Sequence, residues 1–351
     1  MITVKDIARH AGVSLGTVDR VLHNRGKVAP DTEARVREAI QNLSYTPNVH
    51  ARNLSHGKVF VIDVLIPHLE SDGGYWHEPY RGMERAFSRL NMSNLELRTS
   101  FFNRYDEQSF LDYVNARCRA NDEHGMPDGL LLAPVVSPDA QRLLAECIAT
   151  YSLPSISFDS RLEDSQIPFV GQDPKQGGHV AARLAKLMKD TGTSVATVTL
   201  GRVDPHLRAR AEAFREYWQE ISSGTVHELS LLDGSGPDYE KELAGLLREI
   251  RDEVGAVFVT NASADLVVGA FESLDVRRHI PIIGYDILPQ NANLLRDGRI
   301  DAIISQRPQT QGYEAAHMLT QHLVFGEPLD SDILMPVEIV LPENVDSFQS
   351  E

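Results

Sequence analysis

From residue 58 onward, short apolar runs alternate with segments of helical character. Each run is rich in Val, Ile, Leu or Phe, as expected for a buried strand, and YRGMERAFSRL at 80–90 is typical of the helices between them. This alternation predicts parallel sheets in a doubly wound arrangement, which binds ligands at the carboxyl ends of its strands. The runs are VFVIDVLIP (59–67), LELRTSFF (95–102), DGLLLAP (128–134), PSISFD (154–159), SVATVTL (194–200), GAVFVTN (255–261), IPIIGYD (280–286) and DAIISQ (301–306).

The first residues of the chain follow a different pattern, with apolar side chains at helical spacing. Thr3 and Asp6 form a capping pattern that predicts a first helix at 4–11. Gly12 then permits a sharp turn, and Ser14 predicts the start of a second helix at 15–23. Helix, short turn and helix is the geometry that places a second helix in the major groove of DNA. Any small helical hairpin with a glycine turn would show the same pattern.

The continuation favours DNA binding over an ordinary hairpin. The segment DTEARVREAIQNLSY at 31–45 predicts a third amphipathic helix, capped by Asp31 or Thr32, and this completes a three-helix head. Pro47 ends that element, and residues 48–54 have the length of one more short helix. The inward side chains of the third helix are expected to be Val36, Ala39, Ile40 and Leu43.

Charge is divided unequally between the two parts of the chain. The whole chain has 34 basic and 50 acidic residues, a net charge of −16. Residues 1–60 hold nine of the basic and five of the acidic ones, a net of +4, which leaves 25 basic and 45 acidic residues, or −20, for the remainder. This is the asymmetry expected of a nucleic-acid-binding head on a body that repels DNA.

Two segments of the head and hinge carry a specific family resemblance. TVKDIARHAGVSLGTVDRVLHN (3–24) is similar to the T-x-x-D-[VI]-A-x-x-A-G-V-S-x-x-T-V-S-R-x-L-N signature of the LacI family of bacterial transcription regulators, and YTPNVHARNL (45–54) to its Y-x-P-N-x-x-A-R-x-L hinge. The body resembles the family's effector domain, which is related to periplasmic sugar-binding proteins. The fragments that carry this likeness are FVGQDPKQGG (169–178), IIGYD (282–286), RDGRIDAIISQRPQTQGYEAA (296–316) and LVFGE (323–327).

The resemblance implies a small all-α helix-turn-helix head, a hinge helix, and an α/β body of the periplasmic binding protein-like type I fold. The head and hinge are expected at 1–57 and the effector-binding and dimerisation domain at 58–351. In the body, the first subdomain is expected at about 58–160 plus 291–322, and the second at about 161–290 plus 323–351. The implied function is that of a repressor, a homodimer or tetramer that binds an inverted-repeat operator in double-stranded DNA.

The resemblance also implies which residues contact DNA. Leu15 and Gly16 lie first on the expected reading helix but offer no polar side-chain group, so most polar reading falls to Arg20. Asp19 departs from the family's usual Ser, and its carboxylate either reads a cytosine, braces Arg20 or weakens phosphate binding. Leu54 is the expected wedge in the minor groove. The full set is Thr3, Ser14, Leu15, Gly16, Thr17, Asp19, Arg20, His23, Asn24, Arg25, Tyr45, Asn48, His50, Ala51 and Leu54.

The effector site is likewise expected from the resemblance, in a cleft between the subdomains. The chemistry fits a sugar or polyol, because carboxylates accept from hydroxyls, an arginine donates a planar fork, and an aromatic face covers a sugar ring. The expected residues are Tyr75, Trp76, Asp159, Asp173, Arg210, Asn261, Asp286 and Gln306.

Each of these residues also has a structural alternative. Trp76 suits core packing, Arg210 a structural ion pair, and Asp286 a loop cap. Two departures from the family pattern weaken the transfer of a hexose site. Ala262 follows Asn261 where many members have Asp, and Ala213 stands where Gly is usual.

Other functions find less support in the sequence. An enzyme is not expected, because no G-x-S-x-G, Walker loop or H-E-x-x-H occurs, and the histidines lack metal-ligand spacing, so neither a cofactor nor a metal is expected. The alternative is a DNA-binding regulator controlled by a partner protein docked on the acidic body. Polar residues in MITVKDIARH and the short apolar runs predict no secretory signal and no membrane span, hence a cytoplasmic protein. Cys118 and Cys147 are expected to be reduced thiols.

Overall fold

The chain folds into two compact units, residues Met1–Gly57 and Lys58–Glu351. We call them the head and the body and describe each by itself. The computed structural model describes residues 4–22, 28–43, 58–90, 94–104, 106–118, 125–134, 137–189, 192–201, 204–232, 237–276 and 278–348. The hinge segment 48–54 lies outside the described residues, as do Thr3, His23, Asn24, Arg25 and Tyr45.

Three helices make up the described part of the head: α1 (Val4–Ala11), α2 (Leu15–Leu22) and α3 (Pro30–Asn42). Gly12 turns the chain between α1 and α2 with a φ of 64°, a value that favours glycine. Ser14 Oγ accepts from the backbone N–H of Thr17 at 3.2 Å and so caps the start of α2. The three helices share one apolar core, formed by Ile7, Ala8, Ala11, Val18, Val21, Val36 and Ala39.

The start of α3 differs from the sequence expectation. The helix begins at Pro30, and its cap residue is Ala29, which makes no side-chain capping bond. Asp31 and Thr32, expected as the cap, are instead the next residues of the helix. The reason is that proline at the first helical position fixes φ and needs no hydrogen-bonded N–H, so it starts the helix without a polar cap.

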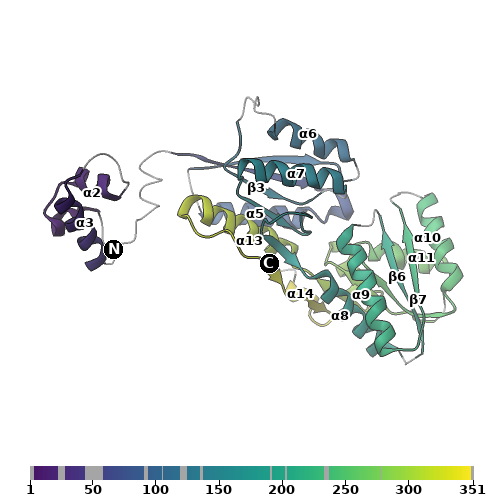
Figure 1. The fold of residues 1–351 in the computed structure, drawn as a ribbon. Coiled ribbons are helices and arrows are strands. Elements are labelled where there is room, and N and C mark those ends of the chain that lie inside the picture. Colours follow the sequence, from purple (N-terminus) through teal and green to yellow (C-terminus); the bar gives the residue numbers. More distant parts are fainter. Residues whose placement is uncertain are drawn as a thin grey trace. The chain divides into compact units, whose positions relative to one another are not determined.

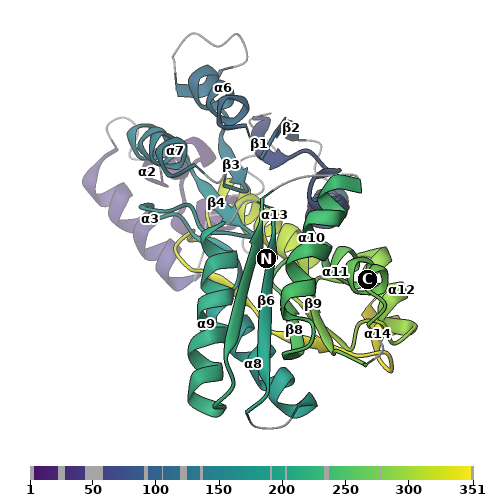
Figure 2. The same cartoon turned by 90° about the vertical axis from the view of Figure 1, so that its right-hand side faces the viewer.

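The described part of the body contains two six-stranded sheets, each covered by helices on both faces (Figures 1 and 2). The first sheet has the order β11-β5-β4-β3-β1-β2 and is parallel throughout. Helices α5 and α13 pack on one face of it, and α6 and α7 on the other. The bounds are β1 Phe60–Pro67, β2 Leu95–Phe102, β3 Gly129–Leu132, β4 Ser155–Phe158, β5 Phe169–Gln172, β11 Ile333–Met335, η1 Ser71–Gly74, α5 His77–Leu90, α6 Glu107–Cys118, α7 Pro138–Tyr151, α13 Pro308–Thr320 and η2 Gln321–Phe325.

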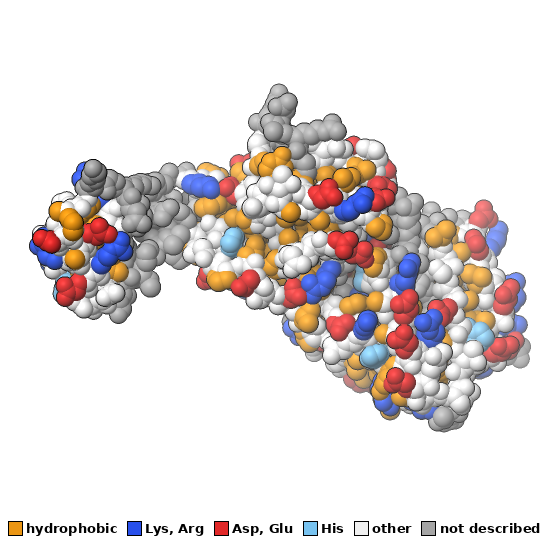
Figure 3. Space-filling view, viewed as in Figure 1, with side chains coloured by type: hydrophobic (Ala, Val, Ile, Leu, Met, Phe, Trp, Pro, Cys, Tyr) orange, Lys and Arg blue, Asp and Glu red, His pale blue; other side chains and the backbone are white. Residues whose placement is uncertain are grey.

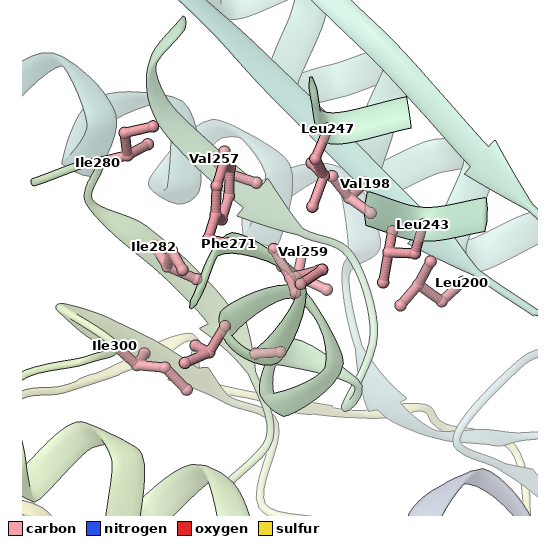
Figure 4. Close-up of a cluster of buried hydrophobic side chains, with 14 of the residues drawn as sticks. Val198, Leu200, Leu243, Leu247, Val257, Val259, Phe271, Ile280, Ile282 and Ile300 are labelled. Carbon is pink, nitrogen blue, oxygen red and sulfur yellow. The ribbon is translucent and has the colours of Figure 1, made fainter. Parts of the chain in front are cut away.

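The second sheet repeats this order as β12-β10-β9-β8-β6-β7, and only β12 runs antiparallel to its neighbour. Helices α8 and α9 cover one face. On the other face α10, α11 and α12 enclose the apolar cluster drawn in Figure 4. The bounds are β6 Ser194–Leu200, β7 Val226–Leu231, β8 Val254–Val259, β9 Ile282–Tyr285, β10 Ala302–Ser305, β12 Glu338–Val340, α8 Pro174–Met188, α9 Pro205–Ile221, α10 Pro237–Ile250, α11 Ala264–Ser273, α12 Pro289–Arg296 and α14 Val345–Phe348.

Sheet membership moves the subdomain boundaries away from those expected from the sequence. The chain passes between the subdomains after β5, after β10 and between β11 and β12, rather than near residues 160, 290 and 322. The segment that holds β5 therefore belongs to the first subdomain, and the one that holds α12 and β10 to the second. Strand pairing decides this membership, and a short apolar strand does not reveal its neighbours in its own sequence.

One side chain ties the three crossovers together. Gln172, at the end of β5, donates from Nε2 to the carbonyls of Ser305 and Pro336, at 3.1 and 2.9 Å. Its Oε1 accepts from the hydroxyl of Tyr285. Gln172 thus holds the three crossover segments together where the two subdomains meet.

The sequence expectation about Cys147 was wrong. Cys147 on α7 is disulfide-bonded rather than reduced. Separation along the chain carries no information on whether two sulfur atoms come within bonding distance, because that depends on how the helices pack.

Candidate functional site

The two subdomains enclose a cleft at the carboxyl ends of their strands. Both sheets have the order in which the strand sequence reverses beside the first strand, and ligand sites of doubly wound folds lie at this reversal. The side chains that line the cleft follow β1, β2 and β4 in the first subdomain and β6, β8 and β9 in the second, and Gln306 lies at the crossover after β10. The lining residues are Asp72, Tyr75, Arg104, Asp159, Leu200, His206, Leu207, Arg210, Asn261, Ala262, Asp286 and Gln306.

Gln306 connects the walls of the cleft through a buried polar network. Its Nε2 donates to Tyr75 Oη at 3.1 Å and to Asp286 Oδ2 at 3.0 Å, so it joins one residue from each subdomain. The Tyr75 hydroxyl donates in turn to Asp159 Oδ1 at 2.7 Å. Charged and polar groups are expensive to bury unless they are paired, so this network holds the side chains in defined orientations.

Arg210 is held rigidly in the second subdomain by α9. Its guanidinium donates to the Thr260 carbonyl at 3.0 Å and to Gln306 Oε1 at 2.9 Å, and its centre lies 3.7 Å from the centroid of the Tyr285 ring. The position of α9 depends on Gly178 of α8, where a Cβ would collide with the backbone carbonyl of Arg210. Close helix packing thus presents a fixed planar donor to the cleft.

Several polar atoms that line the cleft are buried without a hydrogen-bond partner among the described residues. They are Nδ1 of His206, Nε of Arg210, Oδ1 of Asn261 and Oδ1 of Asp286. An unsatisfied buried polar atom costs free energy, so such atoms mark places where a bound molecule supplies the missing partner.

Burial favours the uncharged forms of three titratable groups in the cleft, Asp159, His206 and Asp286. Burial raises the pKa of Asp286 to about 7, and the neighbouring carboxylate of Asp159 acts in the same direction. Burial also raises the pKa of Asp159. For His206, burial and then the positive charges of Arg210 and Arg104 lower the pKa well below its usual range, so the imidazole is neutral at pH 7.

Three of the cleft aspartates have strained backbone conformations. Asp72, Asp159 and Asp286 have φ values of 54°, 66° and 61°, in the left-handed region that residues other than glycine rarely adopt. Strain of this kind persists only where the surrounding structure enforces it, and it concentrates at ligand sites.

Six of the residues expected at the effector site line this one cleft: Tyr75, Asp159, Arg210, Asn261, Asp286 and Gln306. Trp76 and Asp173 are not among the lining residues. Trp76 is 1% exposed and donates from Nε1 to Asp72 Oδ2 at 2.8 Å, which places it in the core. Asp173 caps α8 by accepting from the backbone N–H of Lys175 at 2.9 Å.

Three titratable lining residues had not been expected from the sequence, namely Asp72, Arg104 and His206, and neither had Asp204, which pairs with Arg104. Arg104 follows the run LELRTSFF, and His206 follows SVATVTL at the start of α9. The rule that ligands meet the carboxyl ends of parallel strands identifies both positions as candidates. Asp72 lies in an irregular turn, and no periodic pattern in the sequence marks it.

In the head, α2 presents one exposed face that carries both apolar and charged residues. Leu15, Gly16, Asp19 and Arg20 are exposed, whereas Val18 and Val21 face the core. Thr17 is half-buried, and its hydroxyl lies 2.9 Å from that of Ser14. The exposed positions are those expected to face DNA.

Comparison with known families decides the classification. A model of the lacI family of bacterial regulatory proteins matches residues 3–48, and a model of the periplasmic binding protein domain matches residues 62–328. The chain belongs to the lacI family. It therefore combines a helix-turn-helix head with a periplasmic binding protein-like body, as the resemblance implied. It is a DNA-binding transcriptional regulator and not an enzyme.

Individual relatives of this lacI-family chain agree with that assignment. The HTH-type transcriptional regulator RegA of Clostridium saccharobutylicum is 26% identical over 298 residues, which cover 81% of this chain and 82% of RegA. The ribose operon repressor of Bacillus subtilis (strain 168) is 27% identical over 349 residues, 97% of each chain. The structure of a proposed LacI transcriptional regulator from Bacteroides fragilis superimposes with a TM-score of 0.74 at 24% identity, covering 83% of this chain and 99% of that one. No helix in the described part of this chain is long and apolar enough to span a membrane.

Proposed function

We propose that this regulator is a repressor whose operator affinity is controlled by a sugar or polyol bound in the cleft between the two subdomains. The observation that carries the proposal is the set of buried polar atoms in the cleft that have no hydrogen-bond partner in the part of the chain that the structure describes. Asn261 Oδ1 and Asp286 Oδ1 accept, Arg210 Nε donates, and His206 Nδ1 does either according to its tautomer. Hydroxyl groups both donate and accept, so a polyol satisfies such a mixed set.

The relatives support the same reading. The ribose operon repressor of Bacillus subtilis matches almost the full length of this chain, and its name includes both a sugar operon and repression. Both features are extended to this chain. Because helix-turn-helix proteins read two half-sites as dimers, we also infer a homodimer that places α2 of each head in successive major grooves of an inverted repeat.

A titration of the full-length protein tests the effector class. We expect saturable heat from D-ribose or another neutral pentose, hexose or polyol in isothermal titration calorimetry, and a changed affinity for operator DNA when that compound is present. Control by a partner protein was the alternative, and Figure 3 shows acidic and basic side chains interspersed over the visible face of the second subdomain rather than gathered into one acidic patch. Absence of binding across a full panel of neutral sugars and polyols would contradict the proposed effector class.

A further inference from the structure

An ion pair crosses the cleft and joins its two walls directly. Arg104, which follows β2 in the first subdomain, pairs through its guanidinium with the carboxylate of Asp204, which precedes α9 in the second. The two side chains are 9% and 5% exposed. A pair this buried is screened little by water, and breaking it leaves an uncompensated charge.

Arg104 is fixed from its own side of the cleft as well. Its guanidinium donates to Asp72 Oδ2 at 2.6 Å, and its centre lies 5.2 Å from the centroid of the Trp76 ring. The indole of Trp76 donates to the same carboxylate oxygen of Asp72. Because Arg104 is held in place before it meets Asp204, little side-chain freedom is lost when the pair forms.

Apolar contacts close the cleft around this bridge. Tyr75 and Trp76 of the first subdomain belong to the same buried cluster as Ala262 and Leu288 of the second. The remaining cavity has a volume of only about 30 Å³. Sites for small molecules are typically about 300–1,000 Å³, so a sugar does not fit until the walls separate.

We propose that the Asp72–Arg104–Asp204 bridge is an internal latch that closes the cleft without an effector. An effector then enters only by breaking the Arg104–Asp204 pair. A neutral ligand group that has both hydrogen-bond donors and acceptors can take the place of Asp204 beside Arg104 and the place of Arg104 beside Asp204. An anion is instead repelled by the carboxylates of Asp72 and Asp204, which already flank Arg104. Arg104 and Asp204 therefore also decide which effectors enter. This inference goes beyond the proposed function, and its test needs neither DNA nor an effector.

The distance between the subdomains tests the latch in the full-length protein. Spin labels on ketone-bearing amino acids at Leu143 of α7 and Leu187 of α8, which are 44% and 75% exposed, report this distance by pulsed electron paramagnetic resonance. The labelled protein is diluted with unlabelled protein so that pairs within one chain dominate. We expect Arg104→Met to lengthen and broaden the distance distribution, because Asp204 gains solvation when the cleft opens.

Two further variants make the outcome decisive. Asp204→Asn keeps the size of the side chain and removes its charge, so it carries the test if Arg104→Met does not fold, and it should give a smaller shift of the same sign. Arg161→Met removes an ion pair with Asp332 that lies within the first subdomain, and it should leave the distribution unchanged. The latch is refuted if the folded Arg104 and Asp204 variants keep the wild-type distribution, or if Arg161→Met shifts it equally.

Discussion

At the scale of single residues, the cleft stores unfavourable groups that a compact protein ordinarily avoids. Asp286 combines a buried carboxyl, an oxygen without a hydrogen-bond partner among the described residues, and a strained backbone. The sequence IIGYD does not reveal any of these three properties, although the position of Asp286 after a strand marks it as a candidate site residue. The cost of Asp286 to the folded state leads to a prediction about pH.

Asp286 should make the body less stable as pH rises from about 4 to about 7. Its folded pKa of about 7 lies above the ordinary value of about 3.9, so the folded protein keeps a proton that the unfolded chain releases in this range. Stability that is fully present below about pH 4 is therefore lost as pH approaches about 7. We expect Asp286→Asn to flatten the pH dependence of the free energy of unfolding, measured with urea between about pH 5 and pH 8. Most of the loss of stability that Asp286 causes falls in this range.

Asp332 provides the control for that measurement. Its hydrogen bond from Arg161 lowers its pKa, so its contribution is present above its ordinary pKa and is lost only in more acidic solution. Asp332→Asn should leave the slope between about pH 5 and pH 8 unchanged. An equal slope in wild type and Asp286→Asn would show that Asp286 is ionised in the folded body.

Arg20 is the residue on the exposed face of α2 expected to read a base. If it makes a bidentate contact, Arg20→Ala should weaken specific binding by about 1–3 kcal/mol and relax the preference at one position per half-site. Arg37→Ala is a matched control, because Arg37 lies on α3 in an ion pair with Glu33 at 2.7 Å. Affinities for cognate and scrambled duplexes at fixed salt measure the effect. Equal loss on both duplexes would mean that Arg20 contacts only phosphate.

At the scale of elements, the approach of α8 to α9 positions the guanidinium of Arg210. Gly178→Ala should lower the midpoint of urea unfolding, at a cost of about 1–3 kcal/mol, because the added Cβ forces the two helices apart. Gly245 of α10 has open space around its missing Cβ, so Gly245→Ala should be neutral or stabilising by up to about 1 kcal/mol. A Gly178→Ala protein as stable as wild type would show that the helix pair adapts without strain.

At the scale of the whole molecule, effector and DNA affinities are expected to be coupled. The two subdomains contribute opposite walls of the cleft, so a ligand that changes their separation favours one arrangement of the body. Linkage requires the coupling to be reciprocal, with a free energy typically of about 1–3 kcal/mol. Asp286→Ala should abolish the response of DNA binding to the effector found by titration while leaving effector-free DNA affinity near that of wild type. Operator affinities measured with and without that effector decide the matter, and a full response in the variant would place the effector elsewhere.

The sequence by itself determined the class of each part of this protein. Apolar spacing and a glycine turn specify the helices of the head, and the alternation of strands and helices specifies the body, because both patterns follow from local geometry that repeats along the chain. Family motifs then pointed to half of the residues that line the cleft.

Only the tertiary structure decided which strands pair, where the chain crosses between subdomains, and which side chains meet. Several features depend on contacts between residues that are far apart in the chain. They are the subdomain membership of β5 and α12, the disulfide at Cys147, the core position of Trp76 and the bridge from Arg104 to Asp204. Their energies depend on distance, burial and neighbouring charge, and no local pattern encodes these quantities, since each one exists only after distant parts of the chain have packed together.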